Sequence, residues 1–179
     1  MRLGVRLLLL PAALALVGCG FHPLYGEMNG KPGAASNFPL VYVPPIELEN
    51  AGYELRNDLL DLTQAKSQPA GALYDFRIIA RDRNQDIAVQ NTQVGPVKEV
   101  EITRYNYTLI VNYQLVDRKT QKVLAKGSES SLSAYDVVNN PYATLSAQQD
   151  AQARTAQDIA EKLRLRLALY FAQAQGAAQ

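Results

Sequence analysis

A long run of alternating side chains near the middle of the sequence constrains the fold more than any other feature. Within the run from Lys98 to Val116, apolar or aromatic residues occupy every second position, and mostly polar residues separate them. The apolar members are Tyr105, Tyr107, Leu109, Val111, Tyr113 and Leu115. Successive side chains of a strand point to opposite faces of a sheet, so this pattern predicts a long strand with one buried face. The buried face requires a second layer of structure.

Three further segments have strand character. The run from Leu73 to about Gln90 alternates in the same way, although Ile79 interrupts its polar side. Residues 39–43 form a short strand that ends at two prolines, and the last strand extends from Lys122 to about Leu132. The polar, Gly and Pro residues of 91–96 predict a loop between the two long strands, and residues 117–120 predict a tight turn.

Two segments have helical spacing. In the first, leucines recur over residues 48–62, and the Gln-Pro-Ala-Gly of residues 68–71 ends the element. In the second, Ser146 and Gln149 form a capping-box pattern ahead of a helix that continues to about Ala174. The apolar stripe of this helix consists of Ala156, Ile159, Ala160, Leu163, Leu167, Tyr170 and Phe171. The i,i+4 pairs Asp150–Arg154 and Asp158–Lys162 mark its solvent side.

The order of these elements, β-α-β-β-β-α, predicts an α+β fold in one domain over residues 39–175. Two helices would cover one face of a four-stranded sheet as a two-layer sandwich. Strands joined by short turns pair antiparallel, whereas the first two strands, joined through a helix, can pair in parallel if they are neighbours. The sheet is therefore expected to be mostly antiparallel.

The N-terminus has the three parts of a signal peptide. Arg2 and Arg6 precede an apolar run from Leu7 to Val17, and the small residue Gly18 precedes Cys19. The run is shorter than the roughly 20 residues that span a bilayer, which favours a cleaved segment over a retained anchor. Residues 1–18 are therefore interpreted as a signal peptide, and the Gly- and Pro-rich residues 19–38 as a flexible tether.

Residues 16–19 (Leu-Val-Gly-Cys) resemble the lipobox of bacterial lipoproteins. This resemblance implies that Cys19 receives a diacylglycerol, that the chain is cut after Gly18, and that the new amino group takes an N-acyl chain. Several acyl chains hold a protein stably on a membrane. By the sorting rule of bacterial lipoproteins, Asp after the cysteine retains the protein in the inner membrane, so Gly20 permits the outer membrane. We expect the protein on the periplasmic side of the outer membrane. The alternative is an ordinary signal peptide that contains a free cysteine.

The rest of the chain carries little that predicts catalysis. The one histidine, His22, has no partner residues for a zinc site, and the serines of residues 128–133 lack a nucleophile-elbow motif. No phosphate-binding glycine loop is present, so we expect neither an enzyme nor a cofactor or metal. The 18 Lys and Arg residues nearly balance 17 Asp and Glu residues, which argues against a nucleic-acid partner. Lys98 and Arg104 are candidate contacts for anionic groups, although a solvated strand face is the preferred interpretation of any one such residue.

Three stretches make the chain resemble the LptE-type lipopolysaccharide-assembly lipoproteins, in particular their alphaproteobacterial branch. They are GCGFHPLYG at residues 18–26, SAYD at 133–136 followed by PYA at 141–143, and the last helix with IA at 159–160 and LRLRL at 163–167. The resemblance implies two helices on a four-stranded sheet. It also implies a plug inside the β-barrel protein LptD, which helps to place lipopolysaccharide in the outer leaflet. Members of this family bind lipopolysaccharide, and Lys98 and Arg104, chosen from their position on the predicted strand and not from the resemblance, are the candidate contacts for its phosphates.

Two other classes of function stay open at this point. An auxiliary lipoprotein of a lipid-trafficking ABC transporter could use the same anchor and a comparable small domain. A periplasmic hydrolase would need an acid–base or nucleophile set, and the sequence contains no recognisable one.

Overall fold

The computed structural model describes the backbone of residues 33–94 and 97–177, and the side chains of these residues except 88–102 and 177. In this part of the chain the elements follow the predicted order, with a 3₁₀ helix ahead of them. They are η2 (Ala34–Leu40), β1 (Val41–Tyr42), α2 (Asn50–Thr63), β2 (Tyr74–Val94), β3 (Val97–Asp117), β4 (Val123–Asp136) and α3 (Pro141–Ala177).

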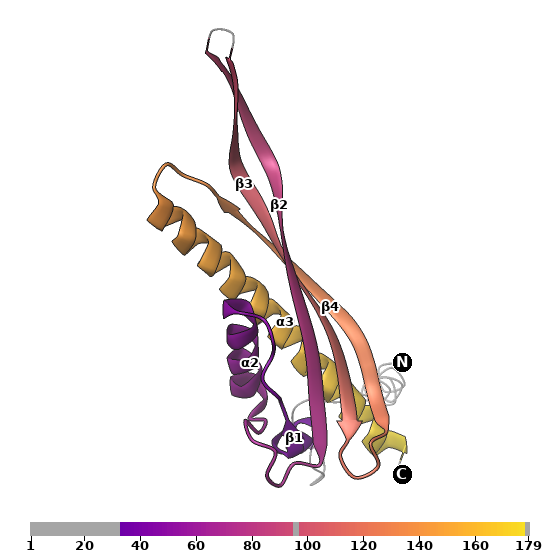
Figure 1. Ribbon diagram of the computed structural model, residues 1–179. Helices are drawn as coiled ribbons and strands as arrows, with labels where there is room; N and C mark the ends of the chain where they lie inside the picture. The colour runs from indigo at the N-terminus through magenta and orange to yellow at the C-terminus, as the bar shows by residue number, and fades with distance from the viewer. Residues whose placement is uncertain (1–32, 95–96, 178–179) are drawn as a thin grey trace, which may run out of the picture.

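The strands form one four-stranded sheet in the order β1-β2-β3-β4. β1 pairs with β2 in parallel, and the other two pairs are antiparallel. Both helices lie on the same side of the sheet, with α3 along β4 and β3 and α2 against α3 (Figure 1). The predicted fold class, a two-layer α+β sandwich on a mostly antiparallel sheet, is confirmed.

The core lies between the apolar row of β3 and the apolar stripe of α3. The fully or almost fully buried members are Tyr107, Leu109, Val111 and Leu115 of β3, and Ala156, Ile159, Ala160, Leu163 and Leu167 of α3. From α2, Leu55 and Leu59 complete this layer. At the C-terminal part of α3, the Phe171 ring lies 6.4 Å from Phe38 and 5.4 Å from Tyr74 between ring centroids. Phe38 thereby joins η2 to the core.

The hairpin of β2 and β3 is longer than the sequence predicted. The expected loop at residues 91–96 is wrong, because β2 continues to Val94 and β3 begins at Val97. The polar residues of 91–94 adopt strand structure because they pair with β3, as Asn91 does with Val100. Beyond a register irregularity at residues 86–89, the hairpin projects past the helices (Figure 1). β4 likewise extends beyond its expected end, to Asp136.

The long helix begins earlier than the capping box at Ser146 indicated. The side-chain oxygen of Asn140 accepts hydrogen bonds from the backbone N–H groups of Tyr142 and Ala143, at 3.0 and 3.4 Å. Asn140 is thus the N-cap, and Pro141 occupies the first helical position, where its missing N–H costs nothing. The predicted break at this proline is therefore a helix start. Within residues 33–94 and 97–177 no helix, α3 included, is both long and apolar enough to cross a bilayer.

The N-terminal part of the domain also differs from expectation. The packed region reaches at least to Ala34, which is buried in η2, so order extends beyond the expected boundary at residue 39. The expected strand at residues 39–43 is reduced to Val41–Tyr42. α2 ends at Thr63, ahead of the predicted stop, because Gln64 adopts a left-handed φ of 53° and its N–H bonds the Leu60 carbonyl at 2.8 Å.

Gly127 of β4 lies directly opposite Tyr113 of β3. A Cβ at residue 127 would lie 2.5 Å from the Tyr113 hydroxyl oxygen and 2.8 Å from Cζ, so the ring occupies the space of a side chain. Tyr113 packs on its other side against Phe76, with ring centroids 5.6 Å apart. The glycine therefore allows an aromatic residue to cover the strand.

We expect Gly127→Ala to lower the free energy of unfolding by about 1–3 kcal/mol, because the added methyl group forces Tyr113 away from Phe76. Urea denaturation of both proteins measures the difference. Gly176→Ala is the matched control, since a Cβ there meets no atom within 4 Å. An equal loss in the two variants would contradict this account of Gly127.

Candidate binding surface

The side of the sheet away from the helices is uncovered in the part of the chain that the structure describes. Because the apolar rows of β2 and β3 face the helices, the alternate residues point to the other side. We call these residues the open face: Arg77, Ile79, Arg81 and Arg83 of β2; Thr108, Ile110, Asn112 and Gln114 of β3; Lys126, Ser128, Ser130 and Leu132 of β4. The strand register places them in rows of three, such as Ile79, Asn112 and Ser128.

The open face combines positive charge with exposed apolar groups. The residues named include four basic side chains and no carboxylate, and Asp75, on the same side of β2, lies at their border. Ile79 and Leu132 add apolar surface to the open face, since they expose 62% and 59% of their area. A hollow lined by Arg77, Ile79 and Lys126 also has Gly127 and Tyr113 in its lining. Such a surface suits a ligand or partner that carries both anionic and apolar groups.

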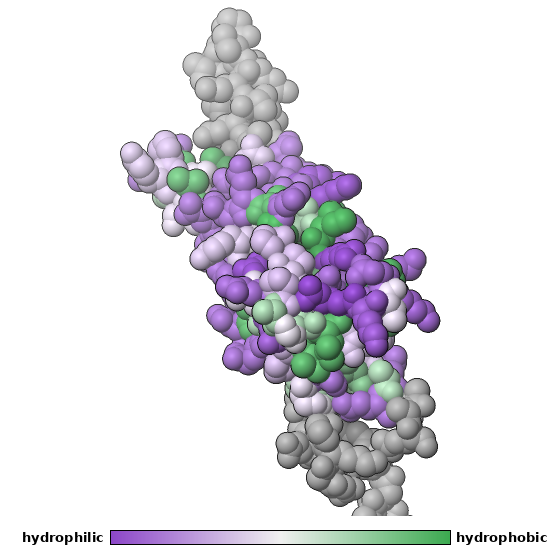
Figure 2. Space-filling model, turned by 60° about the horizontal axis from the view of Figure 1, so that its bottom comes forward, coloured by the Kyte–Doolittle hydropathy of each residue, from purple (hydrophilic) through white to green (hydrophobic). Residues whose placement is uncertain are grey.

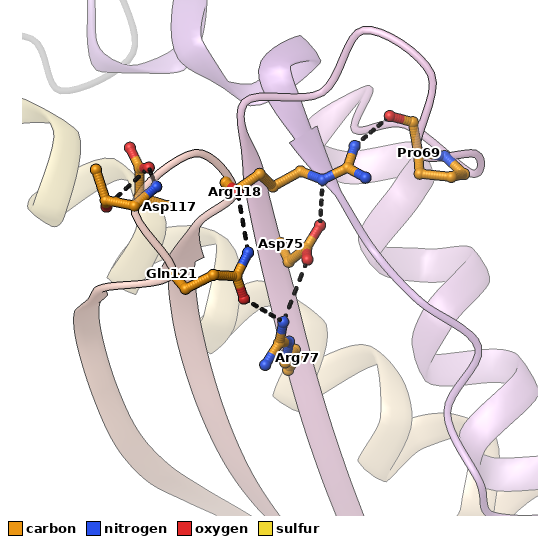
Figure 3. A network of polar contacts seen from close by, with 7 residues as sticks. Pro69, Asp75, Arg77, Asp117, Arg118 and Gln121 are labelled. Atoms are coloured by element: carbon orange, nitrogen blue, oxygen red, sulfur yellow. Dashed lines mark hydrogen bonds and ion pairs between the residues drawn. The ribbon is translucent and has the colours of Figure 1, made fainter.

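A polar network borders the open face at the end opposite the hairpin tip (Figure 3). Asp75 forms ion pairs with Arg118, 3.2 Å from Nε to Oδ1, and with Arg77, 3.5 Å from Nη2 to Oδ2. Arg118 also donates to the Pro69 carbonyl, and Gln121 accepts from Arg77 at 3.5 Å. The network ties the β3–β4 turn to β2 and to the loop after α2. It therefore holds Arg77 in place, which leaves less of its charge for a ligand.

The two basic residues that the sequence proposed do not form a joint site. Arg104 lies in β3 with its Nε 3.6 Å from Asp136 Oδ1, so a carboxylate already offsets its charge. Lys98 pairs with Gln93 near the end of the hairpin, and its side chain lies outside the described residues. Six residues of strand separate the two positions by about 20 Å. Arg77, Arg81 and Arg83 of β2 instead lie on one face, with Ile79 between the first two, a feature visible in the sequence only as alternate residues.

The other candidate residues have structural surroundings or fall outside the structure. Gly18, Cys19 and His22 lie outside the described residues. Ser133 faces α3 and accepts hydrogen bonds from Arg154 at 2.8 and 3.1 Å. Over residues 33–94 and 97–177, no group of three or more His, Cys, Asp or Glu residues is placed to hold a metal ion.

One buried polar group stands out in the core. The Tyr107 hydroxyl is buried, and the Asp82 carboxylate lies close enough to interact with it. Burial, and secondly the negative charge of Asp82, raise the pKa of Tyr107, so its phenol stays protonated at neutral pH. Tyr107 is therefore a neutral core residue.

Comparisons with known proteins agree with this architecture. The family model described as "LptE: Lipopolysaccharide-assembly" matches residues 38–167. An uncharacterized protein of Rickettsia prowazekii (strain Madrid E) is 26% identical over 154 residues, covering 86% of this chain and 88% of that protein.

Two solved structures share the fold. A lipoprotein from Caulobacter crescentus CB15 matches with a TM-score of 0.59 and 26% identity, over 78% of this chain and 96% of that one. The uncharacterized lipoprotein B of Nitrosomonas europaea matches with a TM-score of 0.51 and 9% identity, over 73% and 83%, and shows the fold alone. The family match covers most of the chain, including both helices of the sandwich and all four strands. The chain therefore belongs to the LptE lipopolysaccharide-assembly family.

Proposed function

We propose that this protein is an outer-membrane lipoprotein that forms a plug and assembly partner for an LptD-type β-barrel. Together with that barrel, the protein takes part in placing lipopolysaccharide in the outer leaflet. The observation that carries the proposal is the family match over residues 38–167. The function is adhesive and requires no covalent chemistry or cofactor. The open face supports it, because a broad surface of cations and exposed apolar groups suits contact with a barrel wall or an anionic lipid.

The anchor in this proposal is the lipid on Cys19, which holds the protein on the periplasmic side of the outer membrane. The described chain begins beside η2, which packs on the C-terminal half of α3. In Figure 1 this end of the domain lies opposite the tip of the β2–β3 hairpin. The hairpin thus extends away from the end at which the anchored segment enters the domain.

The lipopolysaccharide contacts in this proposal are basic residues on the sheet side. Lys98 and Arg104 keep their place as candidates from the sequence. Arg81 and Arg83 join them, because they stand exposed on the open face with no carboxylate beside them on that face. Guanidinium groups bind phosphate oxygens in bidentate geometry, and the adjacent Ile79 offers an apolar contact to acyl chains.

We expect the mature protein to begin at Cys19 and to carry a diacylglycerol and an N-acyl chain. Mass spectrometry of the N-terminal peptide from membrane-purified protein measures both features. Cys19→Ala should abolish the added mass and the cut after Gly18, because the thiol is the group to which the first lipid is joined. An unmodified N-terminal peptide in the natural protein would contradict the anchor.

We expect affinity purification of the full-length lipoprotein from detergent-solubilised outer membranes to recover a very large β-barrel protein together with lipopolysaccharide. Recovery of an ABC transporter or its periplasmic shuttle in place of the barrel would favour the alternative, an auxiliary lipoprotein of a lipid transporter. The charge-reversal variant Arg81→Glu/Arg83→Glu should recover less lipopolysaccharide, because repulsion replaces phosphate binding.

The matched control for this variant is Lys119→Glu/Lys122→Glu, which makes the same change of charge at the β3–β4 turn, outside the open face. This control should recover as much lipopolysaccharide as the unaltered protein. Equal losses in both variants would point to net charge and against a role of the open face.

A further inference from the structure

The outer edge of β4 has backbone groups that no strand satisfies within residues 33–94 and 97–177. β4 is the last strand of the sheet. Just past the end of β4, the Val137 N–H donates to the Thr103 carbonyl of β3 at 2.9 Å, so the backbone groups of Val137 point toward β3. The β3–β4 register runs without irregularity from Arg104 to Leu115. Backbone groups alternate in direction along an antiparallel strand, so the N–H and C=O groups of Ser130, Leu132 and Ala134 point away from β3. Such an edge can pair with a strand of another chain.

A row of charged side chains on α3 lies along this edge. Its members are Arg154, Asp158, Lys162 and Arg166, four residues apart and thus on one side of the helix; we call them the edge row. Lys162 Nζ donates to the Ser130 carbonyl at 2.8 Å. Arg154 Nη2 lies 3.4 Å from the Ala134 carbonyl, and Arg166 Nε lies 2.6 Å from Glu129 Oε1. Two edge carbonyls therefore already accept hydrogen bonds from α3.

Further contacts hold the edge row in place. Asp158 Oδ2 lies 2.7 Å from Lys162 Nζ, and Asp150 forms an ion pair with Arg154. The hydrogen bond from Lys162, followed by one from Ser131, holds the pKa of Asp158 below its usual range, so this carboxylate stays charged at neutral pH. The i,i+4 pairs thus do more than stabilise the helix surface, because each one positions a cation that reaches β4.

The side chains of β4 would not by themselves oppose pairing with a second copy. If the β4 strands of two copies paired antiparallel, centred on Leu132, the two Leu132 side chains would face each other. Ser130 of one copy would lie opposite Ala134 of the other. If the β2 strands of two copies paired in the same way, centred on Asp82, Arg81 of one copy would lie opposite Arg83 of the other. Like charges opposite each other destabilise a strand pair, so the arginines protect β2. On β4 that protection is absent, and the edge row is the feature that replaces it.

We propose that the edge row of α3 guards β4 against strand pairing with a second copy of this chain. Pairing would require the Ser130 and Ala134 carbonyls to exchange hydrogen bonds to cations for bonds to a new strand. The cost of releasing Lys162 and Arg154 keeps the edge closed while the protein is held at high local density on a membrane. The proposal concerns β4 and is independent of the barrel partner.

The test compares full-length lipoproteins purified in excess detergent. We expect Arg154→Ala/Lys162→Ala to raise the dimer association constant at least about tenfold, since two charge-assisted hydrogen bonds no longer compete with strand pairing. Light scattering coupled to size-exclusion chromatography measures the dimer, and hydrogen exchange should slow in residues 128–136 as concentration rises. Lys119→Ala/Lys122→Ala removes the same charge from the β3–β4 turn, outside β4, and should behave like the unaltered protein.

A proline identifies the mode of association. In the Arg154→Ala/Lys162→Ala background, Leu132→Pro should restore the monomer, because the N–H of residue 132 points outward and its loss removes only a bond to a new strand. If the double variant does not fold, Lys162→Gln keeps helix propensity and removes the charge, and it should show the same direction of change. Folded edge-row variants that stay as monomeric as the unaltered protein would overturn the proposal, as would equal association of the Lys119→Ala/Lys122→Ala control.

Discussion

Burial of one face of the sheet under α3 is the interaction on which the rest of this structure depends. The rows of Leu109, Val111 and Leu115 on β3 and of Ile159, Leu163 and Leu167 on α3 exclude water from each other. Each such side chain contributes about 1.5–3 kcal/mol when fully buried. Because strand residues alternate, burial of this face exposes the other one. The open face and the free strand edges follow directly, and in the view of Figure 2 the remaining apolar surface forms separate patches within a mostly hydrophilic exterior.

Features with a strong internal period could be predicted from the sequence. The alternation from Tyr105 to Leu115 predicted β3 and its buried side, and helical spacing predicted the stripe of α3. Features that depend on partners could not be predicted in the same way. The outer hairpin lacks a clear period, because its strands are stabilised by each other and extend beyond the core. The start of α3 was misplaced because a proline next to an asparagine reads equally as a break and as an N-cap followed by the first helical position.

The functional surfaces were predictable to different degrees. The lipobox at Cys19 is a local motif, so sequence alone predicts a chemical fate for that residue. The basic row of Arg77, Arg81 and Arg83 becomes evident only once the strand and its exposed side are known. The edge row shows the same limit, because the sequence predicts the pair Asp158–Lys162 but not that Lys162 reaches Ser130 across the helix–sheet interface. Tertiary placement converts a helix-stabilising pair into a contact with a strand edge.

Depletion of the protein from its native cell tests the central claim, an essential partner role in lipopolysaccharide assembly, most directly. The measurement follows the maturation of the LptD-type barrel and the amount of lipopolysaccharide in the outer leaflet as the protein disappears. The account predicts that the barrel fails to mature, that surface lipopolysaccharide falls, and that the natural chain restores both. Normal barrel maturation together with normal lipopolysaccharide display in depleted cells would contradict it.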